Sequence, residues 1–189
     1  MTTAFRKSTL TPRGRQRGQA LVDYSLYIVI AVLVLIGLVA LYLTNRSNTT
    51  ASNETQSLIS TTANIQKLYA NDTNGFTNIS VTNLVANNVI PSGQVTAGAW
   101  ILPVGGTVAV ASANLFGSTG DSFSLTIPGV PANDCSNFTQ ALASNYPYIT
   151  VNGTTIEDST TGVAFSPAAL GPACGTTGNA TIVLEAGRG

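Results

Sequence analysis

Three residues near the start of the chain, Gly18, Gln19 and Asp23, have the types and spacing to take part in one chemical step. Asp23 stands just before an apolar run, residues 24–43, in which Ser25 is the only conventionally polar side chain. A carboxylate costs up to about 2.5–3.5 kcal/mol at the centre of a membrane helix and less near the interface, so it usually has a partner. Hydrolysis of the peptide bond after Gly18 would create such a partner, the α-amino group of Gln19. The alternative is an interfacial aspartate that is favoured by the dipole at a helix N-terminus.

The rest of the chain holds little of the chemistry that enzymes use. It contains no histidine and only two cysteines, Cys135 and Cys174, so neither a Cys/His nucleophile nor a zinc site is expected. The remaining candidates, Glu157 and Asp158, are adjacent in sequence, and adjacent side chains usually point apart. Asp121 follows a glycine and is expected to cap a turn. We therefore predict no catalytic residue, no metal site and no cofactor.

The apolar run is the element that must position the N-terminal residues. At about 1.5 Å per residue it would form a helix roughly 30 Å long, which matches the hydrocarbon core of a bilayer. Five of the eight basic residues precede Gly18, so the N-terminus should stay in the cytoplasm while the rest is exported. In an oxidising compartment, Cys135 and Cys174 are expected to form one disulfide.

Charge and signal pattern narrow the partners and the processing. Removal of residues 1–18 leaves three basic and eight acidic side chains, a net charge of −5, so a basic nucleic-acid-binding face is not expected. A secretory signal peptide is cut after its apolar run, at small residues, and residues 41–44 (Leu-Tyr-Leu-Thr) offer no such site. Cleavage before the run, after Gly18, is the alternative.

Beyond residue 43 the pattern predicts a second half of the helix. Leu58, Thr62, Ile65 and Tyr69 recur at spacings of four, three and four, which indicates an amphipathic helix over residues 44–70. With residues 19–43 it would form one long helix. The turn residues Asn-Asp-Thr-Asn-Gly at 71–75 should end it.

Residues 71–189 are expected to form a globular head of the α+β class. Short β-type runs alternate there with Gly, Pro and Asn, and we predict strands at 107–112, 122–127, 148–151 and 180–184. A short helix is predicted at 134–144, with Asp134 or Ser136 as its N-cap and Phe138, Ala141 and Leu142 facing inward.

The stretch Arg17-Gly18-Gln19-Ala20-Leu21-Val22-Asp23-Tyr24, followed by the long apolar run, resembles the class III signal of type IV prepilins. The resemblance implies that a membrane-embedded prepilin peptidase removes the leader, residues 1–18, by cutting between Gly18 and Gln19. The fifth mature residue of that family is usually Glu, and here it is Asp23, one methylene shorter. In the family this acid is thought to pair with the terminal amine of a neighbouring subunit.

Residues 53–69, 75–76, 89–91, 105–108, 127–135 and 148–153 are similar, in their order along the chain, to type IVb major pilins of the conjugative thin-pilus kind. Trp100 departs from the pattern, because it stands five residues before Gly105 where relatives tend to hold it closer. The resemblance implies a long hydrophobic N-terminal helix, the pilin spine, packed on an antiparallel β-sheet head. It also implies that Cys135 and Cys174 form the disulfide of the family's D-region.

The implied function is that of a major pilin, the structural subunit of a type IV pilus. Such a subunit waits in the inner membrane, meets the pilus assembly machinery there, and enters an extracellular helical homo-oligomer that serves adhesion, cell contact or motility. The alternatives are a minor pilin or pseudopilin of a secretion system, or a single-span membrane-anchored surface binding protein. The sequence does not choose among the roles of the filament, nor does it decide whether the new N-terminus is methylated.

Overall fold

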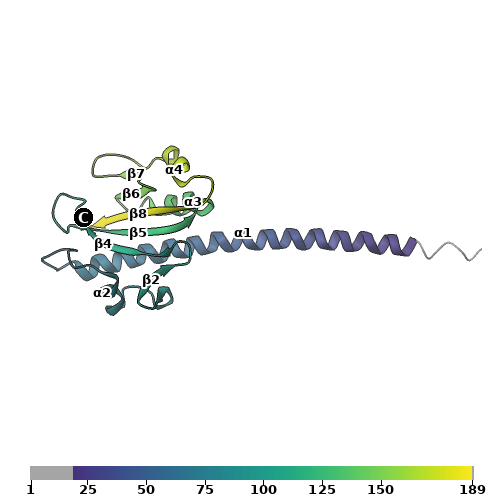
Figure 1. Ribbon diagram of the computed structural model, residues 1–189, viewed down its shortest axis with the longest axis horizontal. Helices are drawn as coiled ribbons and strands as arrows, with labels where there is room; N and C mark the ends of the chain where they lie inside the picture. The colour runs from purple at the N-terminus through teal and green to yellow at the C-terminus, as the bar shows by residue number, and fades with distance from the viewer. Residues whose placement is uncertain (1–18, 189) are drawn as a thin grey trace, which may run out of the picture. The chain divides into compact units, whose positions relative to one another are not determined.

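The computed structural model describes residues 19–188, and within helix α1 (Gln19–Tyr69) it describes the side chains of residues 27–39 and 52–69 (Figure 1). The chain divides into two compact units, Met1–Asn45 and Arg46–Gly189, and each is considered by itself. The predicted leader with Gly18 lies outside the described residues. Gln19 and Asp23 belong to the backbone of α1, and their side chains also lie outside the description.

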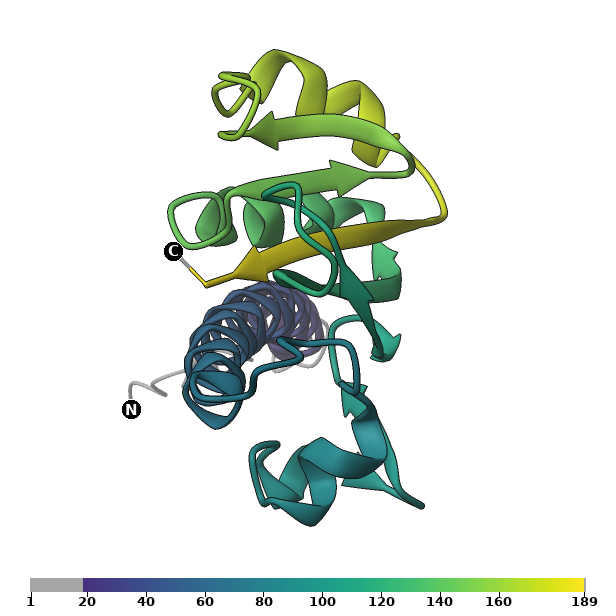
Figure 2. The ribbon, with the colours of Figure 1, turned by 90° about the vertical axis from the view of Figure 1, so that its left-hand side faces the viewer.

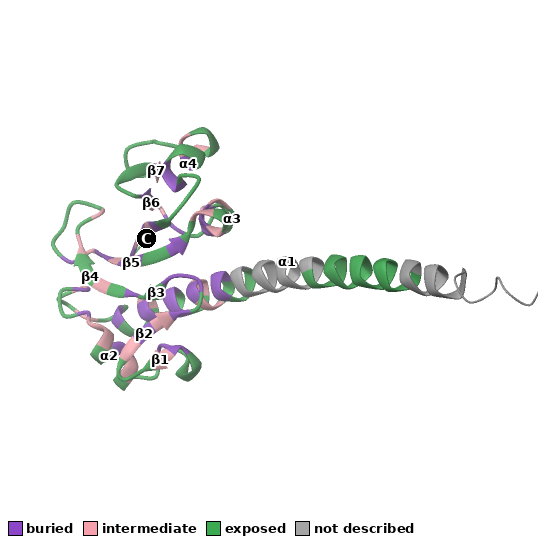
Figure 3. Cartoon of the chain, turned by 45° about the vertical axis from the view of Figure 1, so that its right-hand side comes forward, coloured by how far each residue is buried: buried purple, intermediate pink, exposed green. Residues whose placement is uncertain are grey.

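The described side chains of the first unit are exposed along α1 (Figure 3). Tyr27 is 71% exposed and Leu33 is 64% exposed, and the valines and isoleucines between residues 28 and 39 are about half exposed or more. The predicted membrane span, residues 24–43, coincides with described side chains only at 27–39. In the part of the chain that was described, no helix offers a stretch long and apolar enough to cross a membrane.

A five-stranded antiparallel sheet forms the centre of the second unit (Figure 1). Its strands in spatial order are β4 (Ala109–Ala113), β5 (Ser122–Pro131), β8 (Asn179–Gly187), β6 (Tyr148–Val151) and β7 (Thr154–Asp158). The last strand, β8, lies between β5 and β6 and pairs with both (Figure 2). A smaller antiparallel sheet contains β1 (Val95–Thr96), β2 (Ala99–Leu102) and β3 (Gly106–Thr107). The predicted α+β class with antiparallel strands is confirmed.

Alternation along β8 fixes which face of the sheet meets the core. Ala180, Ile182, Leu184 and Ala186 are buried, whereas the residues between them are partly exposed. This period of two is that of a strand with one covered face. Full burial of each large aliphatic side chain contributes about 1.5–3 kcal/mol, so the central strand is a major source of stability.

The amphipathic stripe of α1 packs into this core. Leu58, Thr62, Ile65 and Tyr69 are all buried, which confirms the predicted stripe. Leu68, which lies beside the stripe in the helix, is 40% exposed. The second half of α1 therefore turns a narrow face toward the head.

The strand predictions differ from the structure mainly at their ends. The predicted strand 148–151 coincides with β6. The predicted strand 107–112 is divided into β3 and β4, because the amide of Val108 donates to the carbonyl of Trp100 at 2.8 Å and the chain changes partner there. Strand β5 continues past the predicted end at Ile127 through a bulge that includes Gly129, whose φ is 82°.

Four shorter helices complete the second unit: α2 (Val81–Ala86), η1 (Ser92–Gln94), α3 (Ala132–Leu142) and α4 (Pro167–Cys174). The predicted start of α3 was wrong, since the helix begins two residues before Asp134 and Pro131 occupies the N-cap position. Proline is compatible with this start because its φ is already near the helical value. Phe138 and Leu142 face inward as predicted, whereas Ala141 is exposed.

Candidate functional site

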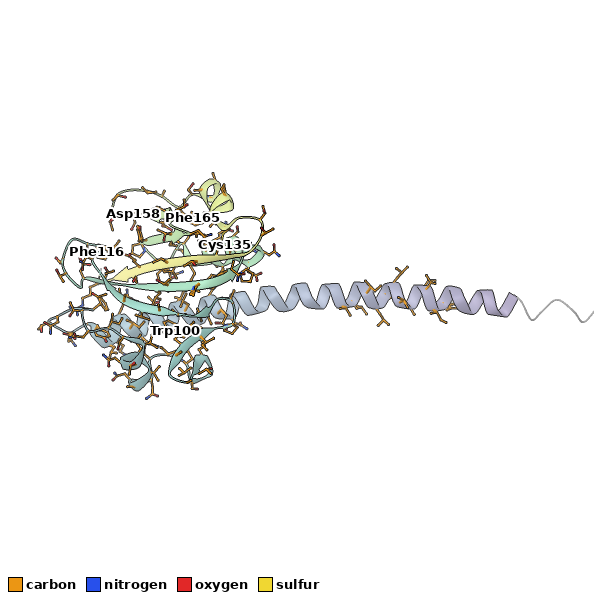
Figure 4. All side chains as sticks on the ribbon, viewed as in Figure 1. Trp100, Phe116, Cys135, Asp158 and Phe165 are labelled. Carbon is orange, nitrogen blue, oxygen red and sulfur yellow. A yellow bond between two sulfur atoms is a disulfide. The ribbon has the colours of Figure 1, made fainter. Side chains whose placement is uncertain are left out.

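Side chains from three separate elements join α1 to the head near residue 54. The side-chain amide of Gln94 donates through Nε2 to Oε2 of Glu54 at 3.1 Å and to Oγ of Ser57 at 2.9 Å. Its oxygen, Oε1, accepts a hydrogen bond from Nε1 of Trp100 at 3.1 Å. Both ends of one amide are thus used, and the contact ties α1 to η1 and to β2. Figure 4 shows Trp100 beside α1.

This junction is buried and contains an ionisable group. Trp100 is fully buried, and Glu54 and Gln94 are each 9% exposed. Burial raises the pKa of the Glu54 carboxyl above its usual value of 4.5, because the charged form loses water. A neutral amide donor compensates only part of that loss. The contact also fixes the orientation of the Gln94 amide. Its nitrogen must face Glu54 and its oxygen must face the indole of Trp100, because a flipped amide would satisfy neither partner.

Two further contacts bind α1 closer to its C-terminal end. The hydroxyl groups of Thr62 and Tyr146 lie 2.6 Å apart in a buried hydrogen bond. Burial raises the pKa of Tyr146 far above its usual value, so its hydroxyl stays protonated and can donate. The side-chain amide of Gln66 donates to the carbonyl of Gly187 at 2.8 Å, which joins the helix to the end of β8.

Arg188 closes the C-terminal end of α1. Its guanidinium Nη2 donates to the carbonyls of Tyr69 and of Asp72, the latter at 2.6 Å, and its carbon Cζ lies 5.6 Å from the centre of the Phe76 ring. A cation near the last carbonyls of a helix is favoured by the helix dipole. Arg188, which follows β8, is therefore fixed to the C-terminal end of α1.

The disulfide Cys135–Cys174 joins α3 to the C-terminal end of α4, with the two Cα atoms 5.8 Å apart. It encloses the segment that contains β6 and β7. Asn152, in the turn between those strands, donates to the carbonyl of Ala173 and accepts from the amide of Thr181, both at 2.8 Å. The enclosed segment is thereby fixed both to α4 and to the central strand.

The acidic residues that the sequence offered as catalytic candidates either accept hydrogen bonds from nearby residues or are partly buried. Asp158 accepts hydrogen bonds from the amides and hydroxyls of Thr160 and Thr161, which lower the pKa of its carboxyl. Glu157 has its pKa raised by burial. Asp121 caps a turn as predicted, since its Oδ2 accepts from the amides of Phe116 and Ser118. Within the described residues, no three His, Cys, Asp or Glu side chains are grouped so that they could hold a metal ion.

The structure brings together residues that the sequence did not single out. Glu54 lies four residues before Leu58, so it continues the buried stripe, and a carboxylate in that position was the available signal for a buried polar contact. No local pattern indicated its partner Gln94, which is 40 residues away. Together with the contacts of Thr62, Gln66 and Tyr69, the Glu54–Gln94 contact holds residues 54–69 of α1 on the head.

Comparison with known proteins gives one family match and similar folds among solved structures. The model of a family described as PilS, N terminal, matches residues 47–186. Among solved structures, TcpA, a type IV pilin from Vibrio cholerae El Tor biotype, matches with a TM-score of 0.55 and 16% identity, covering 73% of this chain and 99% of that chain. A type IV b pilin from Salmonella typhi matches with a TM-score of 0.56 and 17% identity, covering 70% of this chain and 97% of that chain. At these identities the structures share the fold with this chain. No curated protein sequence matches it.

Proposed function

Since the chain belongs to the PilS family of type IVb pilins and is a pilus subunit, we propose that it is the major pilin, made as a membrane-bound precursor and cut after Gly18 before assembly. The family is one of structural subunits rather than enzymes, and its members are parts of extracellular filaments. The finer steps proposed here concern the N-terminal part of the chain.

The exposed apolar face of α1 carries the proposal. Residues 27–39 include eleven large aliphatic or aromatic side chains, from Tyr27 to Val39, that are about half exposed or more. A contiguous apolar surface of this kind marks a membrane or protein contact. Lipid would cover it before assembly, and the same face of neighbouring subunits would cover it afterwards. The hydrophobic free energy changes little in this exchange, because the apolar surface stays out of water in both states.

Asp23 and the new N-terminus supply the specific contact in this scheme. A prepilin peptidase in the inner membrane hydrolyses the Gly18–Gln19 bond and so produces a charged amine on Gln19. The carboxylate of Asp23 pairs with that amine on a neighbouring subunit, which lowers the cost of placing either charge in an apolar surrounding. The contact is head-to-tail, and a head-to-tail contact whose rotation does not close repeats into an open helix.

The cleavage step is tested by mass spectrometry of filaments sheared from cells that produce the full chain. A polypeptide that begins at Gln19 is expected. A filament subunit that begins at Met1 or Thr2 would rule out removal of the leader. The amount of the chain decides its class, since a major pilin is the dominant band of purified fibres and a minor pilin or pseudopilin is not.

Pairing by Asp23 is tested with two substitutions at the same position. Asp23→Ala should be cleaved normally but should assemble poorly, because the amine of Gln19 is then left without an anion. Asp23→Glu keeps the charge and should restore filaments. Equal filament yield from Asp23→Ala and the unchanged chain would remove the pairing role while leaving the family assignment intact.

A further inference from the structure

A cleft of about 440 Å³, lined mostly by Thr, Ser, Asn and Gly residues, lies beside the C-terminal end of α1. It is lined by the turn that follows the helix (residues 73–75 and Thr77), by residues 118–121 of the loop between β4 and β5, and by Arg188. Three parts of the chain that are distant in sequence therefore meet in it.

The chemistry of the lining is that of hydroxyl groups. Thr73, Thr77, Ser118 and Thr119 are exposed and line the cleft, and a hydroxyl can both donate and accept a hydrogen bond. The Thr77 hydroxyl already donates to the carbonyl of Asn74 at 2.9 Å, so it offers the cleft an acceptor. The only charged lining residues are Asp121 and Arg188, which have opposite signs. A balanced lining of this kind gives no preference for an anion or a cation. It suits a neutral ligand that carries many hydroxyl groups.

The two charged residues have partners within the protein. Asp121 accepts through Oδ2 from two loop amides, one of which belongs to Ser118 at 2.7 Å. Arg188 donates to two carbonyls at the end of α1. Their hydrogen bonds stabilise the walls of the cleft, so recognition falls mainly to the hydroxyls.

The walls of the cleft are held in place before any ligand arrives. The amide of Asn74 donates to Oδ1 of Asp72 at 2.8 Å, and the amide of Gly120 donates to Oδ1 of Asn114 at 2.8 Å. The two walls are joined directly, because the amide of Phe76 donates to the carbonyl of Gly120 at 2.8 Å. A site that is already ordered loses less conformational entropy on binding.

An exposed aromatic ring stands next to the cleft. Phe116 is 47% exposed, and its ring lies so close to Gly187 that a Cβ atom there would be 2.6 Å from the ring edge. Gly187 precedes the lining residue Arg188, and Figure 4 shows Phe116 at this end of the head. The C–H face of a sugar ring packs against an aromatic ring, whereas its hydroxyls need polar partners at the side.

We propose that the cleft and Phe116 together form a binding site for a neutral oligosaccharide. The hydroxyls of Thr73, Thr77, Ser118 and Thr119 exchange hydrogen bonds with those of the sugar, and Phe116 packs against a neighbouring sugar ring. This binding is separate from the structural role of a pilus subunit. It gives the head a ligand of its own.

The test uses filaments of the full chain and four immobilised probes: glucose-, galactose- and mannose-terminated neutral oligosaccharides and a sialylated one. At least one immobilised neutral probe should retain the filaments, and the sialylated probe should not retain more of them than the neutral probes do. Thr73→Arg fills the cleft and Phe116→Ala removes the ring, so each should weaken binding about tenfold or more. Thr82→Arg on α2 and Val163→Ala are controls, because both residues are exposed and neither lines the cleft. Both controls should bind within about twofold of the unchanged chain.

Three outcomes would overturn the site: no retention of any neutral probe, preference for the sialylated probe, or undiminished binding by both Thr73→Arg and Phe116→Ala. Thr119→Arg fills the cleft from the opposite wall and replaces Thr73→Arg if that variant assembles poorly. Filament yield is measured for every variant. Filaments that form but do not bind would reject the sugar site alone, and the assignment as a pilus subunit would stand.

Discussion

The side-chain amide of Gln94 donates to the carboxylate of Glu54 across 3.1 Å, and this contact joins α1 to η1. The same amide accepts from the indole of the fully buried Trp100. A chain with few charged residues has thus placed one carboxylate where water is largely excluded. Its position on α1 makes it a sensitive probe of how the helix is held to the head.

Replacing Glu54 by Gln should increase the free energy of unfolding at pH 7. The amide oxygen of the new side chain can still accept from Gln94, and the neutral group avoids the loss of hydration that raises the pKa of Glu54. Urea unfolding of the detergent-solubilised chain measures the difference. Glu54→Leu is the matched variant that loses the acceptor, and it should unfold at lower urea because Nε2 of Gln94 then loses its carboxylate partner. A Glu54→Gln chain less stable than the unchanged one at pH 7 would contradict this account.

The head should be more stable in mildly acidic solution than at pH 7–8. Burial raises the pKa values of Glu54, Glu157 and Glu185 above 4.5 in the folded state, so their contribution is complete below pH 4.5 and is lost as the pH rises through the folded values. Hydrogen bonds lower the pKa values of Asp121 and Asp158 below 3.8, so their contribution is present above pH 3.8 and is lost as the pH falls through the folded values.

These opposite signs place the maximum near the interval between 3.8 and 4.5. Thermal unfolding followed by circular dichroism from pH 3 to pH 8 measures it, with the disulfide intact. In the Glu54→Gln chain the decline toward neutral pH should be smaller. A melting temperature that rises steadily from pH 4 to pH 8 would contradict the prediction.

Replacing both Cys135 and Cys174 by Ser should lower the free energy of unfolding by roughly 3–4 kcal/mol, because the unfolded chain is then free of a closed loop. The two residues are separated by 39 positions, and the loop contains β6 and β7. Since β8 must pair with β6 as well as β5, release of the loop should loosen the sheet on one side. Hydrogen exchange should therefore increase more in β6 than in β4. An equal increase of hydrogen exchange in β6 and β4 would show that the disulfide is not needed to hold the β6 side of the sheet.

Features with a local cause were predictable from the sequence. The spacing of Leu58, Thr62 and Ile65 places them on one side of a helix whatever surrounds it, and the run at 148–151 consists of residue types that favour a strand. Asp121 follows a glycine in a turn, and its cap required only neighbours within five residues. Such features depend on short-range geometry, which the sequence carries directly.

Features with a distant cause were missed. The interruption of the predicted strand at Val108 arises because Trp100 offers a carbonyl there, and the sequence gives no register between the two. Gln94 and Arg188 are polar residues without any local motif, and their partners lie 40 and 119 positions away. The early start of α3 was also missed although its cause is local, because a proline serves at the N-cap position where an Asp or Ser was expected.

Gly75 provides the sharpest test of how the turn after α1 meets the β4–β5 loop. Its φ is 62°, and a Cβ atom there would lie 2.2 Å from the carbonyl oxygen of Gly120. That oxygen accepts from the amide of Phe76, so it cannot move away without losing a bond within the core. Gly75→Ala should therefore reduce the free energy of unfolding by more than about 2 kcal/mol.

Gly93→Ala is the matched control, because no atom lies within 4 Å of a Cβ built there and its φ is not in the left-handed region. Its stability should stay within about 0.5 kcal/mol of the unchanged chain in the same urea titration. If the two alanine variants unfold at the same urea concentration, the turn and the loop are not in the close contact described. If only Gly75→Ala is destabilised, the joint between the end of α1 and the β4–β5 loop depends on the absence of a side chain at this one position.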